Sequence, residues 1–176
     1  MAEFVDRVDD QDRVLGIVDR SQAIRERWLH RVATTVCRDA EGRILVHRRP
    51  PTVSRFPGQY NWLLGGAVNA GESYQAAAER ELEEEAGVRA RVLPLFSFLC
   101  RGAISPYWLA VHEALVTGPV TPDPGEVDWY DWLDMDAFRR AMREWPFVAD
   151  GREAFQRYEQ LDRPAPRVSG DPRPRR

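Results

Sequence analysis

Three glutamates at the end of one predicted helix are the feature that most constrains this chain. The helix spans Ser73–Ala86, with serine at the N-cap position and Gly87 where a helix would end. Glu81, Glu84 and Glu85 have i, i+3, i+4 spacing and therefore share one helix face. Their repulsion costs roughly 0.2–0.5 kcal/mol per pair, and the helix dipole favours cations at this end. A divalent cation with oxygen ligands would compensate for both effects, whereas a solvated acidic face is the alternative that these residues alone leave open.

The basic side chains are all arginines, because the 25 lysine and arginine residues include no lysine. This excludes Schiff-base chemistry on a lysine and the phosphate-binding lysine of a P-loop. The net charge of -3 gives no basic footprint for nucleic acid. No apolar stretch approaches membrane-spanning length. We therefore expect a cytoplasmic protein that binds neither nucleic acid nor a membrane.

Strand-like segments dominate the first part of the sequence, one helix interrupts them, and two helices follow at the end. Strands are expected at 30–38, 43–49, 92–100, 107–117 and 127–133, an apolar stretch at 60–68, and closing helices at 135–145 and 150–161. This order predicts an α/β (α+β) fold in which a mixed sheet lies between helices.

The sequence divides into three parts. Residues 1–29 read as an N-terminal hairpin and a short linker, and residues 30–162 as the main domain. The edge strands of the hairpin could pair with a second copy in a homodimer. Residues 163–176 contain four prolines and five arginines, and we expect them to be disordered.

The residues around the acidic helix resemble the Nudix box, which is a glycine, five residues, a glutamate, seven residues and then R-E-U-x-E-E-x-G-U, where U is apolar. Every specified position is filled, by Gly66, Glu72, Arg80, Glu81, Leu82, Glu84, Glu85, Gly87 and Val88. The resemblance implies the Nudix fold and hydrolysis of a nucleoside diphosphate linked to another group, with Mg2+ or Mn2+.

The same resemblance implies roles for individual residues. It makes Glu81, Glu84 and Glu85 ligands of the metal, with a carbonyl at Gly66 completing the coordination. It gives Glu72 a supporting role in the box loop, and we group Glu72 with the residues on the substrate side of the site.

Hydrolysis of a diphosphate needs an activated water, neutralised charge and alignment. Metal ions held by the glutamates lower the pKa of the water, and a free carboxylate takes its proton. Glu84 in the cluster with Glu81, or Glu126 from a later loop, is the expected base. Glu126 could instead be a further metal ligand or a surface carboxylate. Arg80 lies four residues before Glu84 and can orient its carboxylate.

Arginines at a strand end are the candidates for phosphate binding, because a guanidinium matches phosphate oxygens. Arg48 and Arg49 end a strand, and Arg55 lies in the loop that follows. Strand alternation sends Arg48 and Arg49 to opposite faces, so we expect only one of the two in the site. We assign Arg49 and Arg55 to substrate binding. Tyr60 is a candidate for stacking on a nucleobase, with core packing as its alternative.

A longer stretch, from about residue 4 to residue 161, resembles the Nudix branch related to isopentenyl-diphosphate isomerase. The motifs that carry this resemblance are LHR at 29–31, ILVHRR at 44–49, FPGQYNW at 56–62 and EVDWYDWL at 126–133. In that pattern Arg49 matches an arginine that contacts the diphosphate.

The chain departs from the isomerase at positions that carry its chemistry. The catalytic cysteine would fall at Gly65, and two metal-binding histidines would fall at Ala23 and Ala67, which leaves only His30. We therefore expect a hydrolase that acts on a small phosphorylated molecule. An isomerase-like or prenyl-diphosphate enzyme and a non-catalytic nucleotide-sensing module remain as alternatives.

Overall fold

The computed structural model describes residues 2–161, so the tail predicted to be disordered, residues 163–176, lies outside the described residues. The elements are β1 (Phe4–Val8), β2 (Val14–Asp19), α1 (Arg20–Arg25), β3 (Arg31–Arg38), β4 (Ile44–Arg48), β5 (Tyr60–Asn61), β6 (Leu64–Ala67), α2 (Tyr74–Ala86), β7 (Leu93–Cys100), β8 (Tyr107–Leu115), β9 (Trp129–Leu133), α3 (Met135–Glu144) and α4 (Ala149–Glu159). Each expected strand and helix is present, and the apolar stretch at 60–68 carries β5 and β6.

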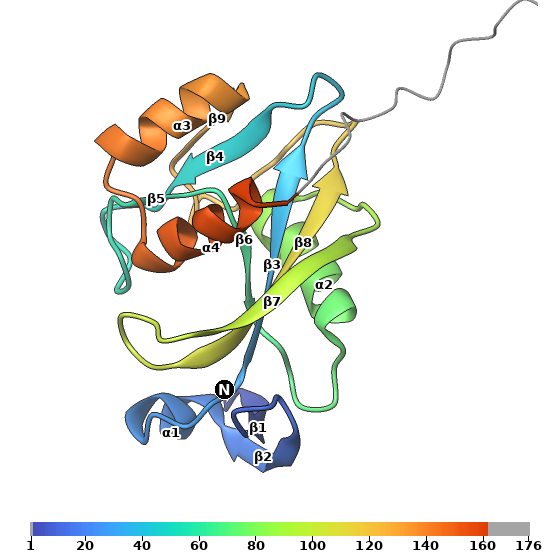
Figure 1. The fold of residues 1–176 in the computed structure, drawn as a ribbon, viewed down its shortest axis with the longest axis vertical. Helices are drawn as coiled ribbons and strands as arrows, with labels where there is room; N and C mark the ends of the chain where they lie inside the picture. The colour runs from blue at the N-terminus through green and yellow to red at the C-terminus, as the bar shows by residue number, and fades with distance from the viewer. Residues whose placement is uncertain (1, 162–176) are drawn as a thin grey trace, which may run out of the picture.

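A seven-stranded mixed sheet forms the centre of the molecule (Figure 1). Its order is β5-β4-β3-β8-β7, and β6 pairs with β3 while β9 pairs with β4. Strands β3 and β8 run parallel, whereas the other strand pairs within the described part of this sheet run antiparallel. The mixed sheet predicted from the sequence is therefore confirmed.

Helix α2 covers one face of the sheet. The Ser73 side chain caps it by accepting a hydrogen bond from the N–H of Ala76 at 3.1 Å, and Gly87 ends it with a φ of 64°. Leu82 is fully buried in a cluster with residues of β3 and β6, and burial of such a side chain stabilises the fold by about 1.5–3 kcal/mol. The apolar stripe thus fixes the helix and leaves its acidic face at the border of the sheet.

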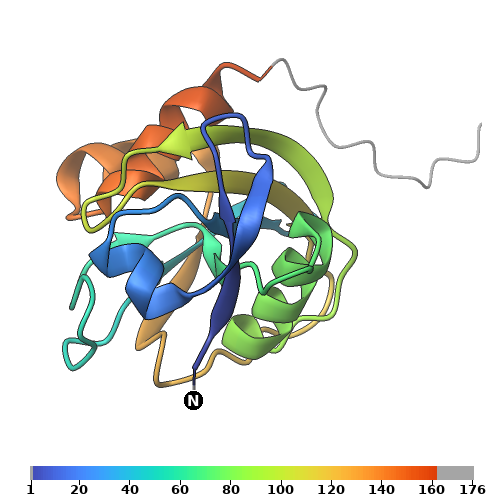
Figure 2. The same cartoon turned by 90° about the horizontal axis from the view of Figure 1, so that it is seen from below.

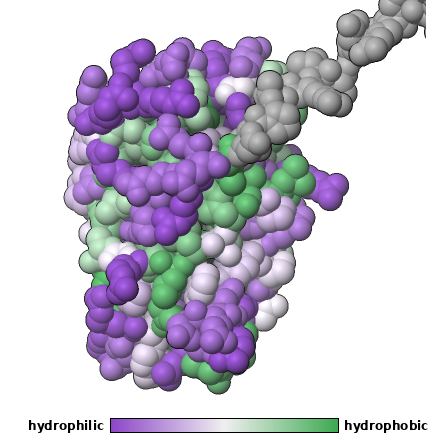
Figure 3. All heavy atoms as spheres, in the orientation of Figure 1, coloured by the Kyte–Doolittle hydropathy of each residue, from purple (hydrophilic) through white to green (hydrophobic). Residues whose placement is uncertain are grey.

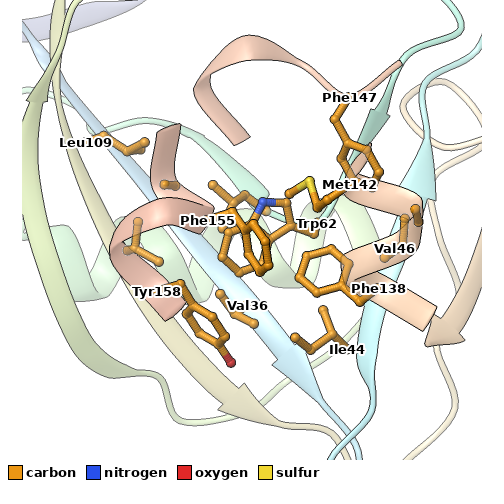
Figure 4. Packing of buried hydrophobic residues seen from close by; sticks show 14 of the residues in the cluster. Val36, Ile44, Val46, Trp62, Leu109, Phe138, Met142, Phe147, Phe155 and Tyr158 are labelled. Atoms are coloured by element: carbon orange, nitrogen blue, oxygen red, sulfur yellow. The ribbon is translucent and has the colours of Figure 1, made fainter. Parts of the chain in front are cut away.

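Helices α3 and α4 cover the opposite face, where aromatic side chains gather (Figure 4). The ring of Trp62 is buried, with its centroid 5.3 Å from that of Phe138 and 5.0 Å from that of Tyr158. Its Nε1–H donates to the carbonyl of Gly151 at 2.9 Å, which satisfies the buried polar atom. The sheet therefore lies between helices, as predicted.

Residues 2–29, called the N-terminal module below, form the predicted β1–β2 hairpin followed by α1 (Figures 1 and 2). The module packs on the sheet through a small cluster of Val5, Ala23 and Ala67. Strand β1 also contacts the loop after β6, because the N–H of Ala70 donates to the carbonyl of Phe4 at 2.9 Å. The module is thus joined to the segment that leads into α2.

Strand β2 faces solvent and exposes Val14, Leu15 and Ile17. The face drawn in Figure 3 is mostly hydrophilic, with green hydrophobic residues that reach its lower end, where the N-terminal module lies. Pairing of this hairpin with a second copy stays a prediction. Within residues 2–161, no helix combines the length and the apolar content needed to cross a membrane.

Candidate active site

A cleft of about 610 Å³ opens beside the acidic face of α2. The predicted site residues that line it are Arg49, Arg55, Gly66, Glu81, Glu84, Glu85 and Glu126. The lining does not include Tyr60, Glu72 or Arg80. The fold thus brings α2, β6, the loop after β4 and the loop before β9 to one hollow.

Two glycines of β6 lie directly against the glutamates of α2. The N–H of Gly65 donates to Oε2 of Glu85 at 3.0 Å. The carboxylate of Glu81 occupies the space beside Gly66. A Cβ atom added at Gly66 would lie only 2.7 Å from this carboxylate. Glycine at these positions therefore lets backbone and carboxylates share one small region.

Burial is the main reason that the pKa of Glu85 rises to about 8, and the negative charges of Glu81 and Glu126 raise it further. The N–H of Gly65 and the charge of Arg49 act in the opposite direction. A carboxyl group that resists ionisation at neutral pH lacks sufficient positive charge around it. This site would therefore gain from a bound cation.

The pKa of the Glu81 carboxyl group is also raised. Burial raises its pKa, the contact with Arg80 opposes this rise, and the charge of Glu84 adds to it. Only 14% of the Glu81 side chain is exposed, whereas 61% of the Glu84 side chain is exposed. The helix face thus presents two withdrawn carboxylates and one that faces solvent.

Arg80 connects the box into a network. Its guanidinium bonds both carboxylate oxygens of Glu72 at 3.0 and 2.9 Å, and the carbonyl of Ala67 at 3.1 Å. It bonds Glu81 at 2.6 Å and reaches Glu84 only at 3.4 Å. Orientation of Glu84 was the role predicted for Arg80, but its shorter contacts are with Glu72 and Glu81. Glu72 thus contacts Arg80 and does not line the cleft.

The donor set fits a hard divalent cation. Within residues 2–161, no three acidic, histidine or cysteine side chains are grouped closely enough to form a metal site, and Glu84 stands apart in contact with Arg80. The buried carboxylates of Glu81 and Glu85 nevertheless offer oxygen ligands of the kind that Mg2+ and Mn2+ prefer. The absence of a side chain at Gly66 lets the carboxylate of Glu81 lie directly against the backbone of β6.

The two adjacent arginines have different surroundings, as strand alternation predicts. Arg49 lines the cleft, where its guanidinium lies 3.2 Å from the carboxylate of Glu126 and its Nε–H donates to the carbonyl of Arg55 at 3.0 Å. Arg48 instead bonds both oxygens of Asp128 at 2.9 and 3.1 Å. Of these two arginines, Arg49 is therefore the one available to a ligand in the cleft.

Tyr60 lies away from the cleft. Its ring packs among those of Trp129, Trp145 and Phe147, with centroid distances of 5.7, 4.7 and 5.9 Å. This position matches core packing, the alternative weighed for Tyr60, and corrects its assignment to the substrate. The signal was ambiguous because a short strand of the sheet presents one aromatic residue to the core as readily as to a cleft.

Position 65 has no room for a side chain. A Cβ atom there would overlap the carbonyl oxygen of Ala33 and approach the Cα of Thr34 to 2.7 Å. Both neighbours are backbone atoms of the paired strand β3, so they cannot move aside as a side chain would. The cysteine that the isomerase pattern places at Gly65 does not fit this backbone.

Sequence reasoning missed several residues of the lining, among them Arg20, Ile24 and Asp150. None of them belongs to a motif; Arg20 ends the segment expected to be the hairpin, and Ile24 lies in the expected linker. His30, the remaining match to the isomerase metal site, also lines the cleft, and burial lowers its pKa. Its match was the one sequence signal that pointed from the N-terminal region toward this cleft.

Comparisons with known proteins agree with this geometry. The family model "NUDIX domain" matches residues 28–158. The chain is 43% identical over 158 residues to an uncharacterized Nudix hydrolase of Streptomyces coelicolor, which covers 88% of this chain and 87% of the relative. It is 28% identical over 147 residues to a prenyl-diphosphate phosphatase of Methanosarcina mazei, with 81% and 86% covered. The crystal structure of DR0079 from Deinococcus radiodurans superposes with a TM-score of 0.74 at 28% identity, over 88% of this chain and 98% of that one.

Proposed function

The chain belongs to the NUDIX domain family of hydrolases, and from this premise we propose that it cleaves a diphosphate linkage in a small phosphorylated molecule, with Mg2+ or Mn2+ as cofactor. One observation carries the proposal. Glu81 and Glu85 lie against two glycines in a cleft that also contains Arg49, and burial raises the pKa of both carboxyl groups. A site of this kind suits a cation and a phosphorylated ligand together.

Glu81, Glu84 and Glu85 would hold the cation, with the carbonyl of Gly66 as a further oxygen ligand. A bound cation supplies charge neutralisation for the phosphate and a water of lowered pKa. The network of Arg80 holds Glu81 in place through a contact of 2.6 Å. Hydrolysis then depends on how the chain's own side chains align the phosphate and accept the proton of the water.

Two carboxylates are suited to accept that proton, Glu84 and Glu126, because both line the cleft and remain in contact with solvent. Glu126 is paired with Arg49 in the structure. A phosphate that takes the guanidinium of Arg49 would leave Glu126 without this partner and so strengthen it as a base. Arg55, in the loop after β4, would supply a second guanidinium for the phosphate.

Prenyl diphosphates are a second candidate class of substrate, favoured by the similarity to the Methanosarcina mazei prenyl-diphosphate phosphatase. The cleft offers apolar side chains for a hydrocarbon chain, among them Ile24, Phe56, Ile104 and Leu109. Isomerisation of such a molecule is not supported, because position 65 cannot hold the side chain that the isomerase pattern needs.

The test is a panel of substrates with purified protein and Mg2+ or Mn2+. Nucleoside diphosphate derivatives, nucleoside triphosphates, dinucleotides and prenyl diphosphates are offered, and the phosphorylated products are measured. We expect turnover of at least one class, loss of turnover with a chelator, and a decrease on the order of 100-fold in Glu85→Gln. Glu83→Gln, an exposed neighbour on the same helix, is the matched control and should retain turnover.

Two outcomes would contradict the proposal. A wild-type protein as inactive as Glu85→Gln on every substrate would favour the nucleotide-sensing alternative. Conversion of isopentenyl diphosphate into its isomer would favour the isomerase and refute the argument from position 65. Exchange of protons between this substrate and the solvent is the signal that would detect it.

A further inference from the structure

The N-terminal module supplies an arginine to the cleft that the family model does not include, since its match begins at residue 28. Arg20 opens α1 and lines the cleft together with Arg49 and Arg55. Helix α1 is held in place by Ala23, which is completely buried against Val5 and Ala67. The backbone that carries Arg20 is therefore fixed to β6, the strand whose glycines contact Glu81 and Glu85.

The hydrogen bonds of Arg20 are incomplete. One terminal nitrogen bonds both carboxylate oxygens of Glu3 at 3.0 and 2.9 Å. The Nε–H of the same guanidinium is buried and has no hydrogen-bond partner among the described residues. Buried donors are nearly always paired in native structures. The described residues therefore leave part of the hydrogen-bonding capacity of this guanidinium unused beside the cleft.

The charge of Arg20 also bears on the site. Its guanidinium acts electrostatically on both Glu81 and His30. The side chain remains 27% exposed, so a ligand in the cleft can reach it. Anionic oxygens are the natural acceptors for a guanidinium, because two parallel N–H donors match two phosphate oxygens.

We propose that Arg20 binds a phosphate group of the substrate, so that the N-terminal module completes the active site. The inference rests on the proposed function for the kind of ligand. A phosphate oxygen would accept hydrogen bonds from the part of the guanidinium that faces the cleft and that Glu3 leaves free. Glu3 pairs with one terminal nitrogen of the guanidinium and leaves its other donors to the ligand. Recognition of the anion is then shared between Arg20 of the module and Arg49 of the sheet.

Calorimetric titration with methylenediphosphonate, a diphosphate analogue that is not hydrolysed, tests this in the presence of Mn2+. Arg20→Gln should weaken binding of the analogue by about 10-fold or more, as expected for loss of a charge-assisted hydrogen bond. Binding of Mn2+ alone should be no weaker than in wild type. Arg25→Gln is the matched control, because Arg25 lies on the same short helix, is mostly exposed and pairs with Glu26; it should bind the analogue as wild type does.

The Glu3→Gln variant distinguishes phosphate binding by Arg20 from a purely structural role of its ion pair with Glu3. This variant removes the ion pair but keeps the arginine, so binding of the analogue should be unchanged or tighter. Equal weakening by Glu3→Gln and Arg20→Gln would overturn the inference, as would wild-type affinity in Arg20→Gln. Should Arg20→Gln melt early, Arg20→Lys keeps the charge without the guanidinium and should still bind more weakly than wild type; wild-type affinity in this folded variant would also overturn it.

Failure of this inference can be told apart from failure of the proposed function. Hydrolysis of a substrate by wild type together with wild-type affinity in Arg20→Gln would refute only the role of Arg20. Binding of the analogue that depends on Arg20, without hydrolysis on the panel, would refute only the enzymatic proposal. A wild-type protein that does not bind the analogue in the presence of Mn2+ would refute the role of Arg20.

Discussion

Replacement of Glu85 by glutamine removes the charge that the metal-free site opposes most strongly. Burial and the charges of Glu81 and Glu126 raise the pKa of Glu85 to about 8 from the usual 4.5. Glutamine keeps the size of the side chain, and its carbonyl oxygen can still accept the hydrogen bond from the N–H of Gly65. The substitution therefore tests charge with little change in packing.

The sign of the effect follows from proton linkage. A carboxyl group whose pKa is higher in the folded state binds its proton more tightly there, so the protein loses stability as pH rises from the unfolded pKa toward the folded one. For Glu85 this window runs from about pH 4.5 to about pH 8. The loss is about 4 kcal/mol at pH 8 and about 1 kcal/mol at pH 5. Glu85→Gln should abolish most of it.

Thermal unfolding in the presence of a chelator measures this at both pH values. Without metal, the Glu85→Gln protein should have a higher melting temperature than wild type at pH 8. This gain in melting temperature should exceed the gain at pH 5 by on the order of 5–10 °C. Glu83→Gln is the control, because the Glu83 side chain is 47% exposed and paired with Arg89. Saturating Mg2+ should stabilise wild type more than Glu85→Gln, and turnover of the variant should be largely lost.

Three results would refute this reasoning. Glu85→Gln could melt at or below the wild-type temperature at pH 8 without metal. The gain could be equal at pH 5 and pH 8, which would assign it to packing. Glu83→Gln could show the same gain, which would assign it to net charge and not to the buried site.

The remaining predictions concern the glycine beside Glu85 and the arginine network. Gly65→Ala should markedly lower the melting temperature, because its Cβ would overlap the carbonyl oxygen of Ala33; Gly16→Ala, in open space, is its control, and equal melting of the two variants would contradict the tight contact. Arg80→Lys should lower turnover, because lysine cannot donate two parallel hydrogen bonds to Glu72; steady-state kinetics measures this, and wild-type turnover would show that the network is dispensable.

The sequence predicted those parts of the site that depend on local geometry. The ends of α2 follow from Ser73 and Gly87, whose effects reach only a few residues along the chain. The opposite surroundings of Arg48 and Arg49 follow from the alternation of a strand. Both predictions rest on local geometry and required no knowledge of tertiary contacts.

Contacts between distant segments were beyond such reasoning. The place of Arg20 in the cleft depends on α1 docking against β6, and the contact of Arg80 with Glu72 depends on the path of the box loop. Tyr60 lies among aromatic residues from β9 and the segment before α4. Hydrophobic periodicity assigns a residue to a buried face, and does not say which other segment it meets there.

The departures from the isomerase pattern come together in one region of the structure. Ala23 and Ala67 fall where that pattern has metal-binding histidines, and both are buried in the cluster that fixes the N-terminal module to β6. Two methyl groups cannot bind a metal, so His30 is left without those partners. Position 65, two residues before Ala67, is closed to any side chain by the backbone of β3. Under the proposed function the carboxylates of α2 would supply the oxygen ligands of the cation, and a hydrolase needs no more than these together with arginines for the phosphate.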